Sequence, residues 1–144
     1  MTIEYDQCLK KGKIMPFSRG RELASRELDL AEEDFGAARE SYNEKRYKWA
    51  TVQTYYSMFH SARALLYARN LKERSHFCLI EAVRTLYVGT GKISVLTLEA
   101  LKKAKMLRED ADYYGRWTQE DSGKLLNAAE EFLKTARKII SGQA

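Results

Sequence analysis

The residues of this sequence that could do chemistry are arginines, histidines, tyrosines and one aspartate, and most of them lie near expected helix ends. Arg108 and Asp112 are four residues apart, a spacing that places two side chains next to each other on a helix. An arginine can bind a phosphate through paired hydrogen bonds, but at this spacing it can equally form an ion pair with the aspartate. Phosphate binding and a helical ion pair are therefore the two alternatives for Arg108, and Tyr113 follows closely in the chain.

His76 follows Ser75 at the expected start of a short helix. An imidazole titrates close to neutral pH, so this side chain could contact a phosphate or transfer a proton. Alternatively, it forms part of a dimer site, or it merely occupies the N-terminus of the helix. The residue types alone leave these alternatives open.

A second set of polar and aromatic side chains lies on the segment 49–70, which contains no Gly or Pro and is expected to form one long helix. At about 100° per residue, two stripes run along this helix. The apolar stripe consists of Val52, Tyr55, Phe59, Ala62 and Leu66. The second stripe, here called the polar strip, consists of Trp49, Tyr56, His60, Arg63 and Tyr67. We interpret the polar strip first as a dimer interface and second as a ligand surface, although buried partners could also satisfy His60 and Arg63.

Several common kinds of site are not indicated by this sequence. It has no HExxH motif and no pair of Glu-x-x-His motifs, so we expect no metal site and no cofactor. The run Gly89-Thr90-Gly91-Lys92 lacks the spacing and the preceding strand of a phosphate-binding loop, and a helix end with a turn explains it better. Cys8 and Cys78 belong to no CxxC or Cys/His cluster, so we expect reduced thiols.

The composition is that of a soluble globular protein. The chain has 144 residues, 44% of them hydrophobic and 31% charged, and a net charge of +5. This length favours one domain, and the moderately basic charge is compatible with a polyanionic ligand. No apolar run approaches the roughly 18 residues that span a bilayer, and the N-terminus has no apolar stretch typical of a secretion signal. We therefore expect a cytoplasmic protein that does not enter a membrane.

Four long helices and one short helix are expected from the periodicity of apolar residues. Their ranges are 18–42, 49–70, 76–88, 93–112 and 119–140. Ser18, Ser75 and Thr118 are the expected N-caps, and Gly36 suggests close approach by a neighbour unless it is merely tolerated. No segment alternates with period two, so we expect no sheet. Short connections favour an up-and-down four-helix bundle over residues 18–141, preceded by an N-terminal arm or short extra helix over 1–17.

Three segments together resemble the HEPN domain family, the higher eukaryote and prokaryote nucleotide-binding domains. They are YYSMFHSARALLY on the long helix, the histidine that opens SHFCLIEAV, and R-E-D-A-D-Y before the last helix. The resemblance covers residues 18–141 and is closest to the small stand-alone prokaryotic members. It implies an all-α bundle that forms a homodimer. It also implies a toxin–antitoxin-like pair with a minimal nucleotidyltransferase, and a nucleotide or RNA as ligand.

Many members of that family are metal-independent ribonucleases with an Arg-x4–6-His motif. Arg69-Asn70 followed by His76 satisfies this motif formally, but it lies between the second and third expected helices rather than near the last ones. Nearer the last helix, Arg108 is followed by Asp112 and Tyr113, neither of which easily replaces an imidazole in proton transfer. If the chain cleaves RNA, the resemblance makes Arg69, His76 and Arg108 the candidate catalytic residues.

These observations lead to one hypothesis and two alternatives. The hypothesis is a nucleotide- or RNA-binding protein of the HEPN type whose ligand contacts are Tyr56, Arg63, His76, Arg108, Asp112 and Tyr113. The dimer interface would consist of Tyr56, His60, Arg63 and Tyr67. The first alternative is a metal-independent endoribonuclease toxin, and the second is a non-catalytic dimeric interaction module. The sequence identifies neither the ligand nor the partner.

Overall fold

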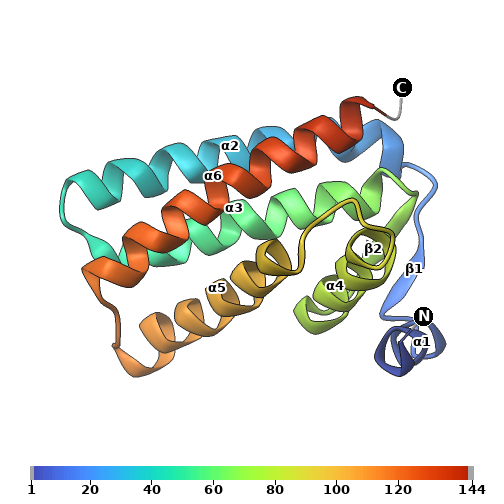
Figure 1. The fold of residues 1–144 in the computed structure, drawn as a ribbon, viewed down its shortest axis with the longest axis horizontal. Helices are drawn as coiled ribbons and strands as arrows, with labels where there is room; N and C mark the ends of the chain where they lie inside the picture. Colours follow the sequence, from blue (N-terminus) through green and yellow to red (C-terminus); the bar gives the residue numbers. More distant parts are fainter. Residues whose placement is uncertain (1, 143–144) are drawn as a thin grey trace.

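A computed structural model describes residues 2–142 and places one long helix, α3 (Tyr47–Tyr67), at the centre of the molecule. Three other long helices pack against it: α2 (Gly20–Asn43), α5 (Val95–Tyr114) and α6 (Gln119–Ser141). Consecutive long helices run in opposite directions (Figure 1). The predicted up-and-down bundle of four long helices is therefore confirmed.

Helix α3 is buried along most of its length because neighbours cover it on several sides. Its buried residues include many small ones, such as Ala50, Ala62 and Ala64, which let those neighbours approach closely. An unpaired polar group in the core is costly, and the buried hydroxyl groups of Thr54 and Ser57 on α3 have backbone partners, whereas that of Ser61 has none among the described residues. The Thr54 hydroxyl donates to the carbonyl oxygen of Ala50 at 2.6 Å, and the Ser57 hydroxyl donates to that of Ala31 on α2 at 2.8 Å.

Two of the three predicted N-caps are confirmed. The Ser75 hydroxyl accepts a hydrogen bond from the Cys78 amide and starts the short helix α4 (His76–Val83). The Thr118 hydroxyl accepts one from the Asp121 amide and starts α6. Beyond Val83 the backbone continues as a π-helix, η1 (Arg84–Val88), so the α-helical part is shorter than the predicted 76–88.

The third predicted cap, Ser18, is wrong. Helix α2 begins at Gly20, and a residue distant in sequence, Asn70, supplies the cap: its side-chain oxygen accepts a hydrogen bond from the Arg21 amide at 3.0 Å. Gly20 permits this arrangement, because a Cβ atom at that position would collide with the backbone carbonyl oxygen of Tyr67. The start of α2 is thus fixed against the end of α3.

Gly36 does not mark a close approach within the chain. A Cβ atom built at this position would meet nothing within 4 Å. The glycine is merely tolerated on the exposed side of α2, which was the second of the two interpretations given to it. Gly123 is instead a position of close approach, where a Cβ would lie 2.9 Å from the hydroxyl oxygen of Tyr42.

The expectation of no sheet is wrong, because two short strands pair in antiparallel fashion. They are β1 (Ile14–Pro16) and β2 (Leu71–Glu73), with Met15 opposite Lys72 at the centre. Three residues are too few to produce a recognisable alternation of apolar and polar side chains. The pair joins the N-terminal segment to the connection that follows α3.

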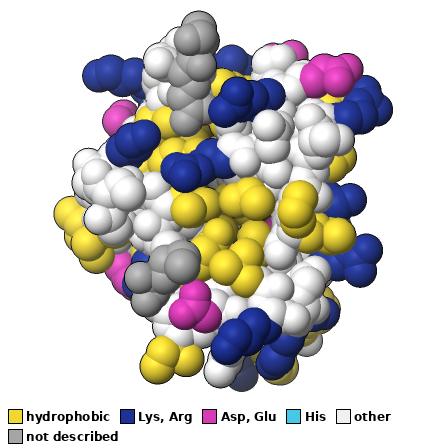
Figure 2. All heavy atoms as spheres, turned by 90° about the vertical axis from the view of Figure 1, so that its right-hand side faces the viewer, with side chains coloured by type: hydrophobic (Ala, Val, Ile, Leu, Met, Phe, Trp, Pro, Cys, Tyr) yellow, Lys and Arg dark blue, Asp and Glu magenta, His cyan; other side chains and the backbone are white. Residues whose placement is uncertain are grey.

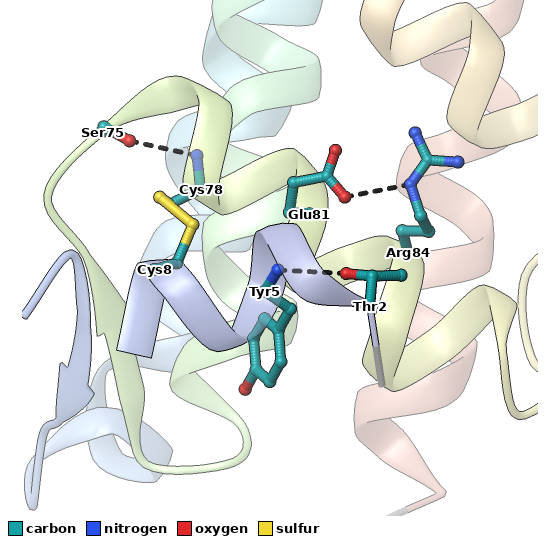
Figure 3. The surroundings of a disulfide bond; sticks show 7 residues. All are labelled: Thr2, Tyr5, Cys8, Ser75, Cys78, Glu81 and Arg84. Carbon is teal, nitrogen blue, oxygen red and sulfur yellow. Dashed lines mark hydrogen bonds and ion pairs between the residues drawn. A yellow bond between two sulfur atoms is a disulfide. The ribbon is translucent and has the colours of Figure 1, made fainter. Parts of the chain in front are cut away.

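The N-terminal segment contains a short helix, α1 (Ile3–Lys10), which packs against α4. A disulfide bond between Cys8 and Cys78 links these two helices (Figure 3). The expectation of two reduced thiols is therefore wrong. The two cysteines are 70 residues apart in the sequence, so their proximity depends on the tertiary fold.

The end of the molecule that carries α1 also carries the end of α6 (Figure 1). Figure 2 shows this end, with a group of hydrophobic side chains at its centre and mostly Lys and Arg side chains around them. Within residues 2–142, no helix is sufficiently long and apolar to cross a membrane.

Replacing Cys8 with Ser should lower the free energy of unfolding by about 4 kcal/mol, because the bond closes a loop of 70 residues and restricts the unfolded chain. Urea unfolding of protein purified without reductant, followed by circular dichroism, would measure the change. Wild-type protein treated with dithiothreitol is the matched control and should unfold like Cys8→Ser. Two reactive thiols in denatured, unreduced wild-type protein would contradict the disulfide.

Candidate functional site

His76 is held at the first turn of α4 by aromatic side chains of α3. Its Nδ1 atom forms a 2.5 Å hydrogen bond with the hydroxyl group of Tyr55. Its ring stacks on Phe59, with 4.6 Å between ring centroids. Because Ser75 fixes the start of α4 and Tyr55 is buried in the core, the position of the imidazole is determined from both sides.

The surroundings of His76 favour the neutral imidazole. Burial lowers its pKa, and the positive charge of Arg108 lowers it further. Burial also raises the pKa of Tyr55, so the phenol keeps its proton. In the part of the chain that the structure describes, the Tyr55 hydroxyl has no hydrogen-bond partner except His76. If this hydroxyl accepted from Nδ1, its own buried proton would have no partner. We therefore assign the hydroxyl as the donor to Nδ1, which places the ring proton of the neutral imidazole on Nε2.

Arg108 projects from α5 toward the same aromatic side chains. Its Nη2 donates a hydrogen bond to the Tyr56 hydroxyl at 2.9 Å, and its Nε lies 3.0 Å from a carboxylate oxygen of Asp112. The guanidinium carbon is 5.4 Å from the ring centroid of Tyr56 and 5.6 Å from that of Tyr113. The helical ion pair between Arg108 and Asp112 is thus present, and it orients the guanidinium across the rings.

Five sequence-predicted site residues therefore form one connected group with Tyr55, four of them in contact with Tyr55 or Arg108 and the fifth being Arg108 itself. This group, here called the His76–Arg108 cluster, consists of Tyr55, Tyr56, His76, Arg108, Asp112 and Tyr113. Tyr55 itself was expected only in the core stripe of the long helix. Its hydroxyl determines which nitrogen of His76 carries the proton, which no sequence pattern indicates.

Arg63, another predicted ligand contact, lies between two carboxylates. Its Nη2 atom is 2.7 Å from Glu73, and its Nη1 atom is 3.2 Å from Glu27 on α2. Glu27 also pairs with Nδ1 of His60 at 3.1 Å. His60 and Arg63 therefore both have ion-pair partners within the chain, which was one of the alternatives given for the polar strip.

Both glutamates in this network are buried, and sequence reasoning missed them. Burial alone would raise the pKa of Glu27, but the hydrogen bond from His60 and the charge of Arg63 hold that pKa below its usual value. The side chain of Glu73 is only 3% exposed, and its Oε1 atom has no hydrogen-bond partner within residues 2–142. Glu27 could have been found, because it lies three residues after Ala24 and four before Ala31, both in the core stripe of α2.

Arg69 lies apart from the His76–Arg108 cluster. Its guanidinium carbon is 5.9 Å from the ring centroid of Tyr87. No interaction in the described part of the chain joins Arg69 to His76. Tyr67, at the end of the polar strip, packs on Phe17, with 4.9 Å between ring centroids. Among the described residues, no group of three or more His, Cys, Asp or Glu side chains could hold a metal ion.

Comparison with known proteins shows the family of the chain. The model of the HEPN domain matches residues 24–139. A Methanocaldococcus jannaschii protein named as a putative toxin is 32% identical over 114 residues, which cover 78% of this chain and 85% of that protein. A second protein of that organism, also named as a putative toxin, is 28% identical over 130 residues, covering 89% and 88%. A Gloeobacter violaceus protein named as a UPF0332 protein is 29% identical over 117 residues, covering 79% and 93%.

Replacing Arg63 with Met should lower the free energy of unfolding by about 3 kcal/mol, because two buried carboxylates lose their counter-ion. Urea unfolding would measure the change. Arg39→Met is the matched control: its ion pair with Glu130 is exposed, so the loss should stay below about 1 kcal/mol. Equal losses in the two variants would contradict a structural role of the network.

The lowered pKa of His76 can be measured directly, because the chain contains only two histidines. In an NMR titration we expect its midpoint below the ordinary histidine value of about 6.5, and a higher midpoint in Arg108→Ala. His60→Asn assigns the signals, and Arg39→Ala is the charge control. Since the folded-state pKa is depressed, protonation favours the unfolded chain, and stability should fall as pH drops below 6.5. An unshifted midpoint would be inconsistent with this account of the site.

Proposed function

The chain belongs to the HEPN domain family, and from this premise we propose that it binds a nucleotide or RNA through the His76–Arg108 cluster. The observation that carries the proposal is the convergence of two hydrogen-bond donors, Nε2–H of His76 and the guanidinium of Arg108, around tyrosine rings. Donors of this kind suit phosphate oxygens, and exposed ring faces suit bases. The similarity to proteins named as putative toxins supports a role in a toxin–antitoxin-like pair.

Binding agrees better than cleavage with the protonation of the cluster. A general base that takes the proton of a ribose 2′-hydroxyl needs a free lone pair on a nitrogen within reach. With Tyr55 donating to Nδ1, the second nitrogen of His76 carries a proton and can only donate. The site as it stands is therefore suited to holding an anion.

Ribonuclease activity is the second candidate function. It would require Tyr55 to accept the hydrogen bond from Nδ1, which would free Nε2 to receive the proton. Arg108 would then stabilise the charge that develops on the phosphate. The observation that favours this candidate is that both His76 and Arg108 adjoin Tyr55. The hydroxyl group of Tyr55 bonds to His76, and its ring centroid lies 6.0 Å from the guanidinium carbon of Arg108. Arg69, the third catalytic candidate, has no contact with either residue in the described structure.

We further propose that the protein forms a homodimer through Tyr56, His60, Arg63 and Tyr67 of the polar strip, with Trp49 outside the interface, and works with a minimal nucleotidyltransferase. Tyr56, His60, Arg63 and Tyr67 are only partly buried in the single chain, which is compatible with further burial in a dimer. A toxin-like protein requires an inhibitory partner, and the family resemblance points to a nucleotidyltransferase in that role. The third candidate function is a non-catalytic dimeric interaction module. In that case the double variant Tyr56→Ala/Arg63→Ala would become monomeric and show no other change in ligand binding.

The binding test uses Arg108→Ala and His76→Ala. Each replacement removes a donor to phosphate worth about 1.5–3 kcal/mol, so each should weaken the binding of a tetrauridylate roughly 10- to 150-fold. Isothermal titration calorimetry at fixed salt would measure the affinity. Arg19→Ala is the matched control, because that exposed arginine pairs only with Glu22 among the described side chains. Light scattering would confirm that the variants keep the oligomeric state of the wild type.

Unchanged affinity in Arg108→Ala and His76→Ala would refute this site. The same proteins also separate binding from cleavage. Wild-type protein incubated with RNA in EDTA should leave the RNA intact if the protein only binds. Fragments that end in a 2′,3′-cyclic phosphate and disappear with His76→Ala would instead establish the ribonuclease.

A further inference from the structure

Four large aromatic side chains are exposed at the end of the bundle where α5 leads into α6. Trp49 is 50% exposed and Trp117 45%, while Tyr113 and Tyr114 are 66% and 67% exposed. The start of α3, the end of α5 and the start of α6 meet at this end, on the left of Figure 1. Packing in the hydrophobic core therefore does not explain why aromatic residues occupy these four positions.

Cationic side chains lie over the exposed rings. The Lys48 ammonium is 4.9 Å from the ring centroid of Trp49 and 5.9 Å from that of Trp117. The Arg116 guanidinium carbon is 5.5 Å from the ring centroid of Tyr114. Neither Lys48 nor Arg116 forms an ion pair with a carboxylate in the part of the chain that the structure describes. Their positive charges thus remain available to an anionic ligand.

These side chains form a surface here called the aromatic–basic track, which consists of Lys48, Trp49, Tyr113, Tyr114, Arg116 and Trp117. It is continuous with the His76–Arg108 cluster, because Arg108 contacts both Tyr56 and Tyr113. Trp49 and Tyr56 are seven residues apart on α3, so they share one side of the helix at a distance of about 10 Å along its axis. The aromatic–basic track and the His76–Arg108 cluster therefore form one continuous row of side chains.

We propose that a single-stranded RNA leaves the His76–Arg108 cluster along the aromatic–basic track, with bases stacked on Trp49 and Trp117 and phosphates bound by Lys48 and Arg116. This inference rests on the proposed function and extends it from a single site to a strand several nucleotides long. Alternating rings and cations suit unpaired bases, whose faces are free to stack on aromatic side chains. In a duplex the bases already stack on each other, so their faces are not available.

The composition of the track favours RNA over a protein partner. Tryptophan and tyrosine are common in both kinds of surface, but lysine is depleted in protein–protein interfaces relative to the rest of the surface. Here the Lys48 ammonium lies near both indole rings. A second copy of the chain would also bring a second Lys48 to the same end, which adds repulsion unless an anion lies between them.

Tryptophan fluorescence tests the inference directly, because Trp49 and Trp117 are the only tryptophans in the chain. A fifteen-nucleotide oligouridylate should quench the fluorescence as uracil rings stack on the indoles. A tetrauridylate should bind at the His76–Arg108 cluster with much less quenching. A fifteen-base-pair RNA duplex should give little quenching at the same concentration and salt.

The double variant Trp49→Ala/Trp117→Ala should bind the fifteen-nucleotide strand at least 10-fold more weakly, since each stacked base contributes about 1–3 kcal/mol. Its affinity for the tetrauridylate should equal that of the wild type. Lys48→Ala/Arg116→Ala should reduce the slope of log affinity against log salt by about 1.4, or 0.7 for each lost phosphate contact. Leu96→Ala, at an exposed residue near the start of α5, is the matched control and should change neither affinity.

Three results would overturn the inference and leave the proposed function intact. The first is wild-type affinity of the tryptophan double variant for the long strand. The second is equal quenching by the duplex. The third is a double variant that changes from dimer to monomer in light scattering without losing RNA affinity, which would assign the surface to a second copy of the chain. A wild-type protein that binds neither oligonucleotide would refute the proposed function, and this inference with it.

Discussion

The burial of α3 among α2, α5 and α6 is the constraint on which the other features of this structure depend. In a helix covered by several neighbours, each polar group left unpaired in the interior costs about 1–3 kcal/mol. The small residues of α3 bring its neighbours close, and the hydroxyl groups of Thr54 and Ser57 donate to backbone carbonyl oxygens. Its residues His60 and Arg63 have partners on other elements, Glu27 and Glu73. Two tyrosines of α3 hold the candidate site, because Tyr55 bonds to His76 and Tyr56 to Arg108.

Two groups of opposite character result on one side of α3. Glu27 and Glu73 surround Arg63 and form a region rich in acceptors, whereas His76 and Arg108 form a region rich in donors. Phe59 joins the two, since its ring contacts His76 on one hand and Arg63 on the other. A nucleotide carries an anionic phosphate, so the donor-rich region supports the proposed ligand.

Much of the secondary structure could be predicted, because its determinants lie within a few residues. Ser75 and Thr118 cap helices through amides three residues away, and Gly115 ends α5 with a positive φ. The cap of α2 escaped prediction because Asn70 supplies it from a distant segment. For the same reason the β1–β2 pair and the Cys8–Cys78 bond were not foreseen. Each of these depends on two segments that meet only after the bundle has formed.

The sequence by itself determined the family, the all-α bundle and most of the side chains of the His76–Arg108 cluster. These follow from residue types, from apolar spacing at 3.6 residues per turn and from local capping, all of which are short-range. Only the tertiary structure decided how the side chains are paired. It placed Arg63 between two buried carboxylates, kept Arg69 away from His76, and set the Tyr55 hydroxyl against Nδ1. Protonation depends on which groups are buried together, and that is a property of packing between distant segments.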